Sequence, residues 1–203
     1  MNVLCVVAHP DDEVLGCGGA LAKHAEAGDT VGICYGTGNY LDERAAARQI
    51  IGASDTWVAC FMLPDQRFDT RPLLDMTQLL ESWSFQPNVV YTHNPDDLNQ
   101  DHALTAKAVL TAFRAPHSQA DILAFETLSS TEFGPAAFQP NHWEVLTWDQ
   151  VNKKTSALCC YRSELKPYPH PRNVPGVKAQ ARWRGQQICQ PYAEAFRILR
   201  SIR

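Results

Sequence analysis

The sequence predicts a single α/β domain built on an open, mostly parallel sheet that is flanked by helices. Three observations lead to this prediction. The chain has 203 residues, which is the length of one ordinary domain. Short apolar runs alternate with segments of helical periodicity, as in parallel α/β folds. Neither a linker nor an internal repeat divides the chain, so residues 1–203 are interpreted as one domain.

The first elements form the shortest unit of such a fold. Residues 2–8 are continuously apolar, which is typical of a strand buried on both faces. A helix of small residues follows and ends at Gly28, and residues 30–35 form a second strand. Further strands are predicted at residues 56–62, 88–93 and 122–126, with helices at 42–52, 73–83 and 101–114. This order predicts a Rossmann-like arrangement.

The last third of the chain is less regular. Residues 129–148 are rich in Pro, Phe, Trp and Asn and are predicted to form loops. Helical patterns return at residues 149–163. After a proline-dense break at residues 167–175, a helix is predicted from about residue 176 to the C-terminus.

Composition excludes several classes of function. The net charge of −4 provides no basic field for nucleic acid. No apolar run approaches the ~18 residues of a membrane span, and the N-terminus lacks the basic region of a signal peptide. Seven scattered cysteines without a Cys-x-x-Cys pair are typical of reduced core thiols. We therefore expect a soluble cytoplasmic protein that binds neither nucleic acid nor a membrane.

Polar clusters follow the first and fourth predicted strands. The first strand ends in Ala-His-Pro-Asp-Asp-Glu at residues 8–13, and the fourth is followed by Asp-Asp-Leu-Asn-Gln-Asp-His at residues 96–102. Ligands of parallel sheets bind at the carboxyl ends of strands, and imidazole with carboxylate suits Zn²⁺. Acidic helix caps are the alternative interpretation, because Asp and Asn favour the N-cap position. Three successive acids repel one another unless a cation lies among them, which favours a metal site.

Glycines at positions 16, 18 and 19 could suggest a dinucleotide site. That motif requires Gly-x-Gly-x-x-Gly directly after the strand. Here Asp11 and Asp12 lie between strand and glycines, and carboxylates repel a pyrophosphate. The sequence therefore argues against nucleotide binding.

The two clusters resemble the motifs of the PIG-L / LmbE-like family of zinc-dependent N-acetylglucosaminyl deacetylases. A third match lies near the C-terminus, where residues 168–172 read Tyr-Pro-His-Pro-Arg, followed by residues 181–185 and 192–196. The three matches occur in the family's order and cover nearly the whole chain. The resemblance implies that His9, Asp12 and His102 bind zinc and that Asp11 is the general base that activates water. Fe²⁺, Co²⁺ or Ni²⁺ would accept the same ligands.

The resemblance also suggests residues for the oxyanion and the sugar. Many family members have a histidine where this chain has Asn99, so the oxyanion or acid role is assigned to His170 or Asn99. In some relatives a C-terminal histidine comes from a neighbouring subunit, so a role for His170 implies a homo-oligomer. Asp65, Arg44 and Arg172 are the predicted substrate contacts, with Arg172 holding a phosphate or a hydroxyl.

The predicted function is therefore hydrolysis of the N-acetyl group of a small N-acetylated sugar or glycoconjugate. Two alternatives remain open at this point. One is a hydrolase of another acylamide, such as a glycopeptide or a thiol-precursor glycoside. The other is a non-catalytic sugar-binding module, against which the intact His9, Asp11, Asp12 and His102 argue.

Overall fold

A seven-stranded sheet forms the centre of the computed structural model, which describes residues 1–115 and 117–202. The strand order is β3-β2-β1-β4-β5-β7-β6. The first five strands are parallel, and β7 is antiparallel to both β5 and β6. The strands are β1 (Asn2–Val7), β2 (Thr30–Tyr35), β3 (Val58–Cys60), β4 (Val89–His93), β5 (Asp121–Phe125), β6 (His142–Val145) and β7 (Ala193–Arg200). The predicted mostly parallel α/β sheet is confirmed.

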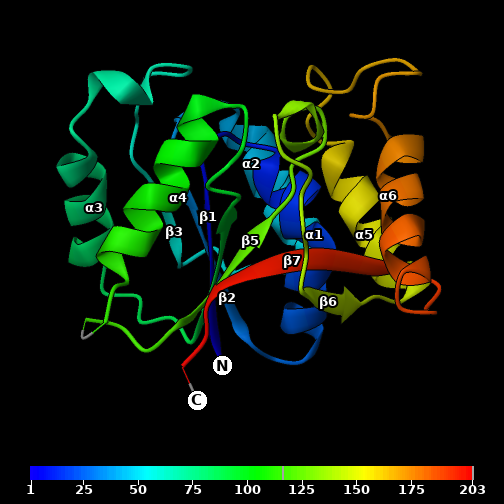
Figure 1. Ribbon diagram of the computed structural model, residues 1–203, viewed down its shortest axis with the longest axis horizontal. Coiled ribbons are helices and arrows are strands. Elements are labelled where there is room, and N and C mark those ends of the chain that lie inside the picture. Colours follow the sequence, from blue (N-terminus) through cyan, green and yellow to red (C-terminus); the bar gives the residue numbers. More distant parts are fainter. Residues whose placement is uncertain (116, 203) are drawn as a thin grey trace.

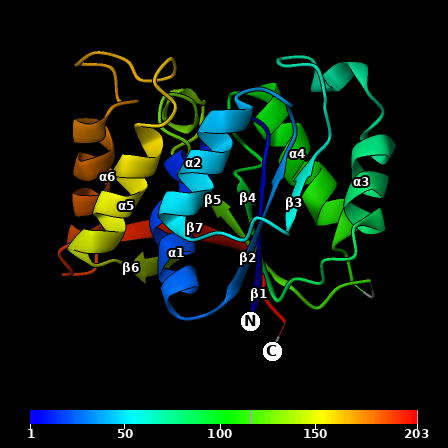
Figure 2. The same ribbon diagram turned by 180° about the vertical axis from the view of Figure 1, so that it is seen from behind.

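Within the described residues, six α-helices cover the sheet. They are α1 (Asp12–Glu26), α2 (Leu41–Ile51), α3 (Leu73–Ser82), α4 (Gln100–Ala112), α5 (Trp148–Leu158) and α6 (Val174–Gln186). In Figure 1 the sheet separates α3 and α4 from α1, α2, α5 and α6. The view from behind shows the same division (Figure 2). Helices on both faces explain why the central strands are apolar throughout.

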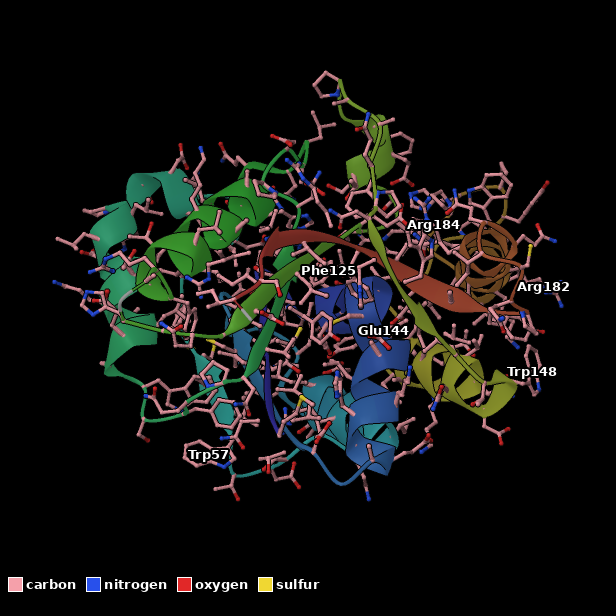
Figure 3. All side chains as sticks on the ribbon, turned by 60° about the horizontal axis from the view of Figure 1, so that its bottom comes forward. Trp57, Phe125, Glu144, Trp148, Arg182 and Arg184 are labelled. Carbon is pink, nitrogen blue, oxygen red and sulfur yellow. The ribbon has the colours of Figure 1, made fainter. Side chains whose placement is uncertain are left out.

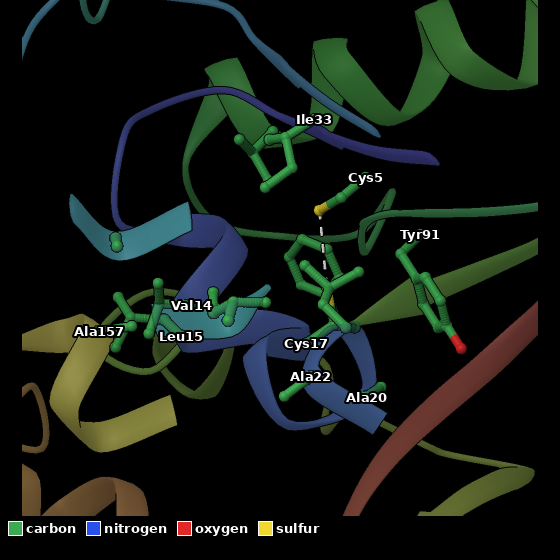
Figure 4. Close-up of a cluster of buried hydrophobic side chains, with 14 of the residues drawn as sticks. Cys5, Val14, Leu15, Cys17, Ala20, Ala22, Ile33, Tyr91 and Ala157 are labelled. Atoms are coloured by element: carbon green, nitrogen blue, oxygen red, sulfur yellow. Dashed lines mark hydrogen bonds between the residues drawn. The ribbon is translucent and has the colours of Figure 1, made fainter. Parts of the chain in front are cut away.

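Strand β1 shows how the sequence builds the two faces. Val3, Cys5 and Val7 belong to the core under α1, whereas the alternating Leu4 and Val6 belong to the core on the opposite face. Figure 4 shows the first of these cores, with Cys5 of β1 facing Cys17 of α1. Their Sγ atoms lie 3.5 Å apart and both residues are fully buried. The run of β1 is apolar throughout because its alternating side chains pack into the cores on the two opposite faces of the sheet.

Two predictions about the C-terminal third were wrong. Residues 193–200, predicted as helix, form β7, and residues 142–145, predicted as loop, form β6. The sequence of β7, Ala-Glu-Ala-Phe-Arg-Ile-Leu-Arg, has high helical propensity. Pairing with strands on both sides overrides that propensity, because it satisfies the backbone of β7 and buries Phe196. The predicted third strand is also shorter, at Val58–Cys60.

Helix α1 is interrupted at Cys17, whose φ of −140° and ψ of 20° are not helical. A Cβ on the neighbouring Gly16 would lie 2.2 Å from the Phe125 ring of β5, so only glycine lets the helix approach this strand. The glycines that superficially resemble a dinucleotide motif thus face packed side chains.

In Figure 3, Trp57 beside β3 and Trp148 at the start of α5 lie at opposite sides of the molecule. None of the helices in the described residues combines the length and the apolar character that crossing a bilayer requires.

Candidate functional site

The candidate site lies where β1 and β4 meet. These neighbouring strands send their connections to opposite faces of the sheet, and ligands of open α/β folds bind at such a switch point. A cavity of about 490 Å³ opens there. The residues that line it come from both strand-end clusters and from four other loops, and are His9, Pro10, Asp11, Asp12, Thr37, Asn39, Tyr40, Asp65, Gln66, Leu98, Asn99, Gln100, His102, Ser129, Ser130, Glu164 and Arg172.

His9, Asp12 and His102 present three ligand atoms to one point. His9 Nδ1 lies 3.3 Å from Asp12 Oδ2 and 3.3 Å from His102 Nε2. The third side of the triangle, from His102 Nε2 to Asp12 Oδ2, is also 3.3 Å. His9 lies in the turn after β1, Asp12 is the first residue of α1 and His102 lies in α4, so the fold brings together groups 90 positions apart in the chain (Asp12 and His102).

The triangle fits a tetrahedral divalent cation. Ligand atoms bound at about 2.0–2.1 Å to a tetrahedral ion lie roughly 3.3–3.4 Å from one another. The three distances of 3.3 Å therefore match the edges of one face of such a tetrahedron. Two imidazoles and one carboxylate also form a donor set suited to Zn²⁺, and three protein ligands leave a position open toward the cavity.

Two buried aspartates orient the imidazoles. Asp101 Oδ2 lies 3.2 Å from His9 Nε2, and Asp97 Oδ1 lies 3.2 Å from His102 Nδ1. Each aspartate contacts the ring nitrogen that faces away from the triangle, which is the arrangement that fixes a metal-binding histidine. Asp101 has no exposed surface and its Oδ1 accepts the backbone N–H of Phe68 at 3.1 Å. Asp97 also accepts bonds from the hydroxyls of Ser130 and Thr131.

The site concentrates negative charge around the two histidines. Burial alone would lower the pKa of both imidazoles, but Asp101 and Asp12 raise the pKa of His9 to about 10. Against the same effect of burial, Asp12 and Asp97 raise the pKa of His102 to about 9. Burial opposes ionisation of Asp12, yet His102 holds its pKa well below the ordinary value. A centre that attracts positive charge so strongly suits a cation.

His93 ends β4 beneath the triangle without belonging to it. Its Nε2 accepts the backbone N–H of Ala8 at 3.0 Å, and its Nδ1 lies 3.3 Å from Thr127 Oγ1. Burial, together with His102, lowers the pKa of His93 to about 4, so the ring is neutral. It stacks on His102 with ring centroids 3.9 Å apart. His93 thus supports the position of His102.

Asp11 directs its carboxylate away from that of Asp12. Its backbone is left-handed, with φ 99° and ψ −27°, and its N–H donates to Glu13 Oε2 at 3.0 Å. Asp11 Oδ2 accepts a bond of 3.2 Å from Arg172. Burial and the neighbouring Asp12 raise the pKa of Asp11 well above its ordinary value, although Arg172 acts in the opposite direction. The two adjacent acids therefore serve different partners.

Arg172 connects Asp11 to the other wall of the cavity. The terminal nitrogen that contacts Asp11 also donates to Glu164 Oε2 at 3.1 Å, and its Nε donates to Ser129 Oγ at 3.0 Å. Tyr40 donates its hydroxyl to Glu164 Oε1 at 2.9 Å. These bonds hold the loop of residues 161–173 against the β1–α1 connection.

The remaining predicted site residues divide into two groups. Asn99 and Asp65 line the cavity, and Asp65 Oδ1 lies 3.2 Å from His9 Nε2. Asn99 caps α4, where its Oδ1 accepts the N–H of Asp101 at 2.9 Å. His170 and Arg44 do not line the cavity. His170 Nδ1 accepts the Arg172 N–H at 3.1 Å, and Arg44 is buried over the Tyr35 ring at 4.8 Å.

Sequence reasoning assigned no role to Asp97, Asp101 or Glu164. Asp97 and Asp101 stand inside the second cluster, so their pairing with the two histidines could have been suggested by the rule that ligand histidines need carboxylate partners. Nothing in the local sequence around Glu164 indicates that it meets Tyr40, from which it is 124 positions distant.

The chain is similar to several known proteins along most of its length. It is 27% identical over 181 residues to the uncharacterized deacetylase YaiS of Escherichia coli (strain K12), which covers 80% of this chain and 91% of the relative. The conserved protein TT1542 of Thermus thermophilus superposes with a TM-score of 0.79 at 24% identity, over 99% of this chain and 96% of that one.

Two further solved structures share the fold but differ in activity. The N,N'-diacetylchitobiose deacetylase of Pyrococcus horikoshii has a TM-score of 0.75 at 20% identity, covering 98% of this chain and 83% of that one. The 4-carboxy-2-hydroxymuconate hydratase GalB of Pseudomonas putida KT2440 has a TM-score of 0.73 at 22% identity, covering 100% and 97%. A deacetylase and a hydratase on one architecture mean that the fold alone does not decide the reaction.

The family is decided by the sequence match. Residues 4–113 match the PIG-L family, described as GlcNAc-PI de-N-acetylase, and they make up more than half of the chain. The matched stretch contains both strand-end clusters and all three corners of the triangle. The chain therefore belongs to the PIG-L family of de-N-acetylases.

Proposed function

We propose that the protein is a metal-dependent hydrolase that removes the N-acetyl group from an N-acetylated amino sugar or its conjugate. One observation carries this proposal, the triangle of His9, Asp12 and His102 with sides of 3.3 Å at the wall of the cavity that Asp11 also lines. Membership of the PIG-L family supports amide hydrolysis as the reaction.

His9, Asp12 and His102 would hold the cation, with Asp101 and Asp97 fixing the two rings. Zinc is the proposed metal, and Fe²⁺, Co²⁺ and Ni²⁺ suit the same donors. A bound divalent cation supplies Lewis acidity, which polarises an amide carbonyl and makes water a better nucleophile at neutral pH.

Asp11 is the proposed general base. Arg172 binds its Oδ2, which leaves Oδ1 to take a proton from the attacking water. The same oxygen can return that proton to the departing nitrogen, because an amide anion is a very poor leaving group. Asn99 uses Oδ1 as a helix cap, so its Nδ2 is available to donate to the developing oxyanion.

Asp65 and Arg172 are the proposed sugar contacts in the cavity wall. The bonds of Arg172 to protein groups run from Nε and one terminal nitrogen, so the other terminal nitrogen is suited to a sugar hydroxyl. Arg44 does not line the cavity, so it is left out of the proposed contact.

The test combines metal analysis with release of acetate. Purified protein is stripped with a chelator, reloaded with each divalent metal and assayed with N-acetylglucosamine, its glycosides, chitooligosaccharides and an N-acylated glycopeptide. His9→Ala, Asp12→Ala and His102→Ala should each lose bound metal and activity together. His117→Ala is the matched control, because this exposed histidine lies outside the cavity.

Two results would change the proposal. Full metal occupancy in one of the three variants removes that residue from the ligand set. Metal binding with sugar binding but no acetate release favours a sugar-binding module, whereas release of acid from glycopeptides alone favours another acylamide.

A further inference from the structure

The charges on the cavity wall are unbalanced. Among the described residues that line the cavity, four are acidic, namely Asp11, Asp12, Asp65 and Glu164, and Arg172 is the single lysine or arginine. Histidines that bind a cation are neutral, so His9 and His102 add no positive charge when the centre is loaded. A divalent cation and Arg172 carry three positive charges, whereas six carboxylates line the cavity or contact its histidines once Asp97 and Asp101 are included. The cavity therefore stays anionic even with its metal.

The positive charge of Arg172 is already engaged. One terminal nitrogen contacts Asp11 Oδ2 at 3.2 Å and Glu164 Oε2 at 3.1 Å. Two carboxylates at this range neutralise the guanidinium toward a third anion. Tyr40 holds Glu164 in place by its own bond of 2.9 Å, so the guanidinium of Arg172 cannot turn its charge toward a phosphate without breaking this chain of contacts.

The other polar lining groups carry no charge. Asn39, Gln66 and Gln100 offer amides, and Ser129 offers a hydroxyl. Groups that both donate and accept suit sugar hydroxyls. Because the wall combines neutral hydrogen-bonding groups with a negative surplus, a phosphate on the substrate meets repulsion without a compensating cation.

Resting on the proposed function, we propose that this site selects N-acetyl sugars that are uncharged or positively charged around the acetamido group. It rejects sugar phosphates and glycosyl phosphodiesters. Arg172, Glu164 and Asp65 are then the residues that determine specificity, and the pairing of Arg172 with Glu164 prevents the arginine from serving as a phosphate anchor.

The test measures binding on a matched pair of probes. N-acetylglucosamine methyl glycoside and the corresponding N-acetylglucosaminyl methyl phosphodiester differ by one negative charge. Calorimetry on metal-loaded and metal-free protein should show the phosphodiester binding roughly tenfold or more weakly at low salt. Raising the ionic strength should reduce the difference between the dissociation constants of the two probes, because salt screens the repulsion of the phosphodiester. Binding of the neutral probe should stay constant.

Charge variants locate the effect. Glu164→Gln and Asp65→Asn should each lower the ratio of the two dissociation constants by roughly threefold or more, because each removes one negative charge from the cavity wall. Asp149→Asn is the matched control, since this exposed acid in the first turn of α5 lies outside the cavity. The ratio should not change in that variant.

Equal or tighter binding of the phosphodiester overturns the inference even if acetate is released from neutral sugars. Selective binding of the neutral probe without acetate release supports the inference and contradicts the proposed hydrolase. Failure to bind either probe contradicts both.

Discussion

Asp11 combines a strained backbone with a buried carboxylate. Its φ of 99° is a conformation that costs a non-glycine residue about 1–3 kcal/mol. The strain has a geometric consequence, since it turns Asp11 toward Arg172 while Asp12 faces the two histidines. With an ordinary strand or helix backbone at Asp11, these two adjacent acids would not reach both Arg172 and the two histidines.

The first prediction separates proton transfer from metal binding. Asp11→Asn should keep its metal and lose activity by about 10²–10⁴-fold, the usual contribution of a general base. Asparagine tolerates the left-handed conformation, so the thermal midpoint should change little. Turnover, metal content and melting are measured on the same preparation. Near-normal turnover would mean that another group activates the water.

The second prediction concerns the oxyanion donor. Asn99→Ser preserves the helix cap, because serine is an equally good N-cap, but removes Nδ2. Loss of an oxyanion donor lowers kcat by about 10²–10³-fold. His170→Ala should cost less than this, because His170 does not line the cavity. A larger loss in His170→Ala than in Asn99→Ser would assign the role to His170, and sedimentation would then test for a homo-oligomer.

At the scale of elements, a buried ion pair forms hydrogen bonds with the backbone on both sides of the break in α1. The backbone N–H groups of Gly19 and Ala20, released by the break, donate to the Glu194 carboxylate of β7 at 2.9 and 2.7 Å. Lys154 of α5 donates to Glu194 at 2.5 Å and to the Leu15 carbonyl at 2.9 Å. Both side chains are at least 95% buried. The pair thus satisfies groups on both sides of the break.

The third prediction tests the contribution of the Lys154–Glu194 ion pair to stability. Lys154→Met leaves the buried Glu194 carboxylate without its cation, which should lower the free energy of unfolding by about 3 kcal/mol. The double variant Lys154→Met/Glu194→Gln should recover part of this loss, because the amide oxygen still accepts from Gly19 and Ala20. Urea unfolding of Lys154→Met, Glu194→Gln and the double variant measures the difference. Additive losses in the double variant would show that the pair is not coupled.

At the scale of the molecule, the candidate metal centre joins separate parts of the fold. His9 follows β1 and Asp12 begins α1, whereas His102 belongs to α4 on the other face of the sheet. The three ligands come together only in the folded protein, so a cation bound by all of them would link the two helical layers and stabilise the native state. Metal affinity is then also folding stability.

The fourth prediction follows from this linkage. Zinc at about 100 times its dissociation constant should raise the free energy of unfolding by about 2.7 kcal/mol, and a chelator should reverse the gain. The increase in the thermal midpoint should disappear in His102→Ala and persist in His117→Ala. An equal increase in His102→Ala would show that zinc binds elsewhere.

Much of the fold could be predicted from local sequence. The apolar run of β1, the stop at Gly52 after α2 and the periodicity of α3 all correspond to observed elements. The errors fall on β6 and β7, whose pairing is antiparallel and depends on distant partners. Helical propensity in β7 is a local quantity and contains no information about the open edge of β5 that the strand covers.

The sequence by itself determined the family, the order of the central elements and the two clusters that supply the metal-binding candidates. Only the tertiary structure decided which side chains meet, because each partner of a long-range contact is chosen by packing rather than by spacing. It brought Asp101 to His9, Asp97 to His102 and Glu164 to Arg172, and it left His170 and Arg44 outside the cavity. Chemistry can be read from residue types, whereas distances and burial arise only when the carboxyl ends of β1 and β4 and the loop of residues 161–173 come together in the folded chain.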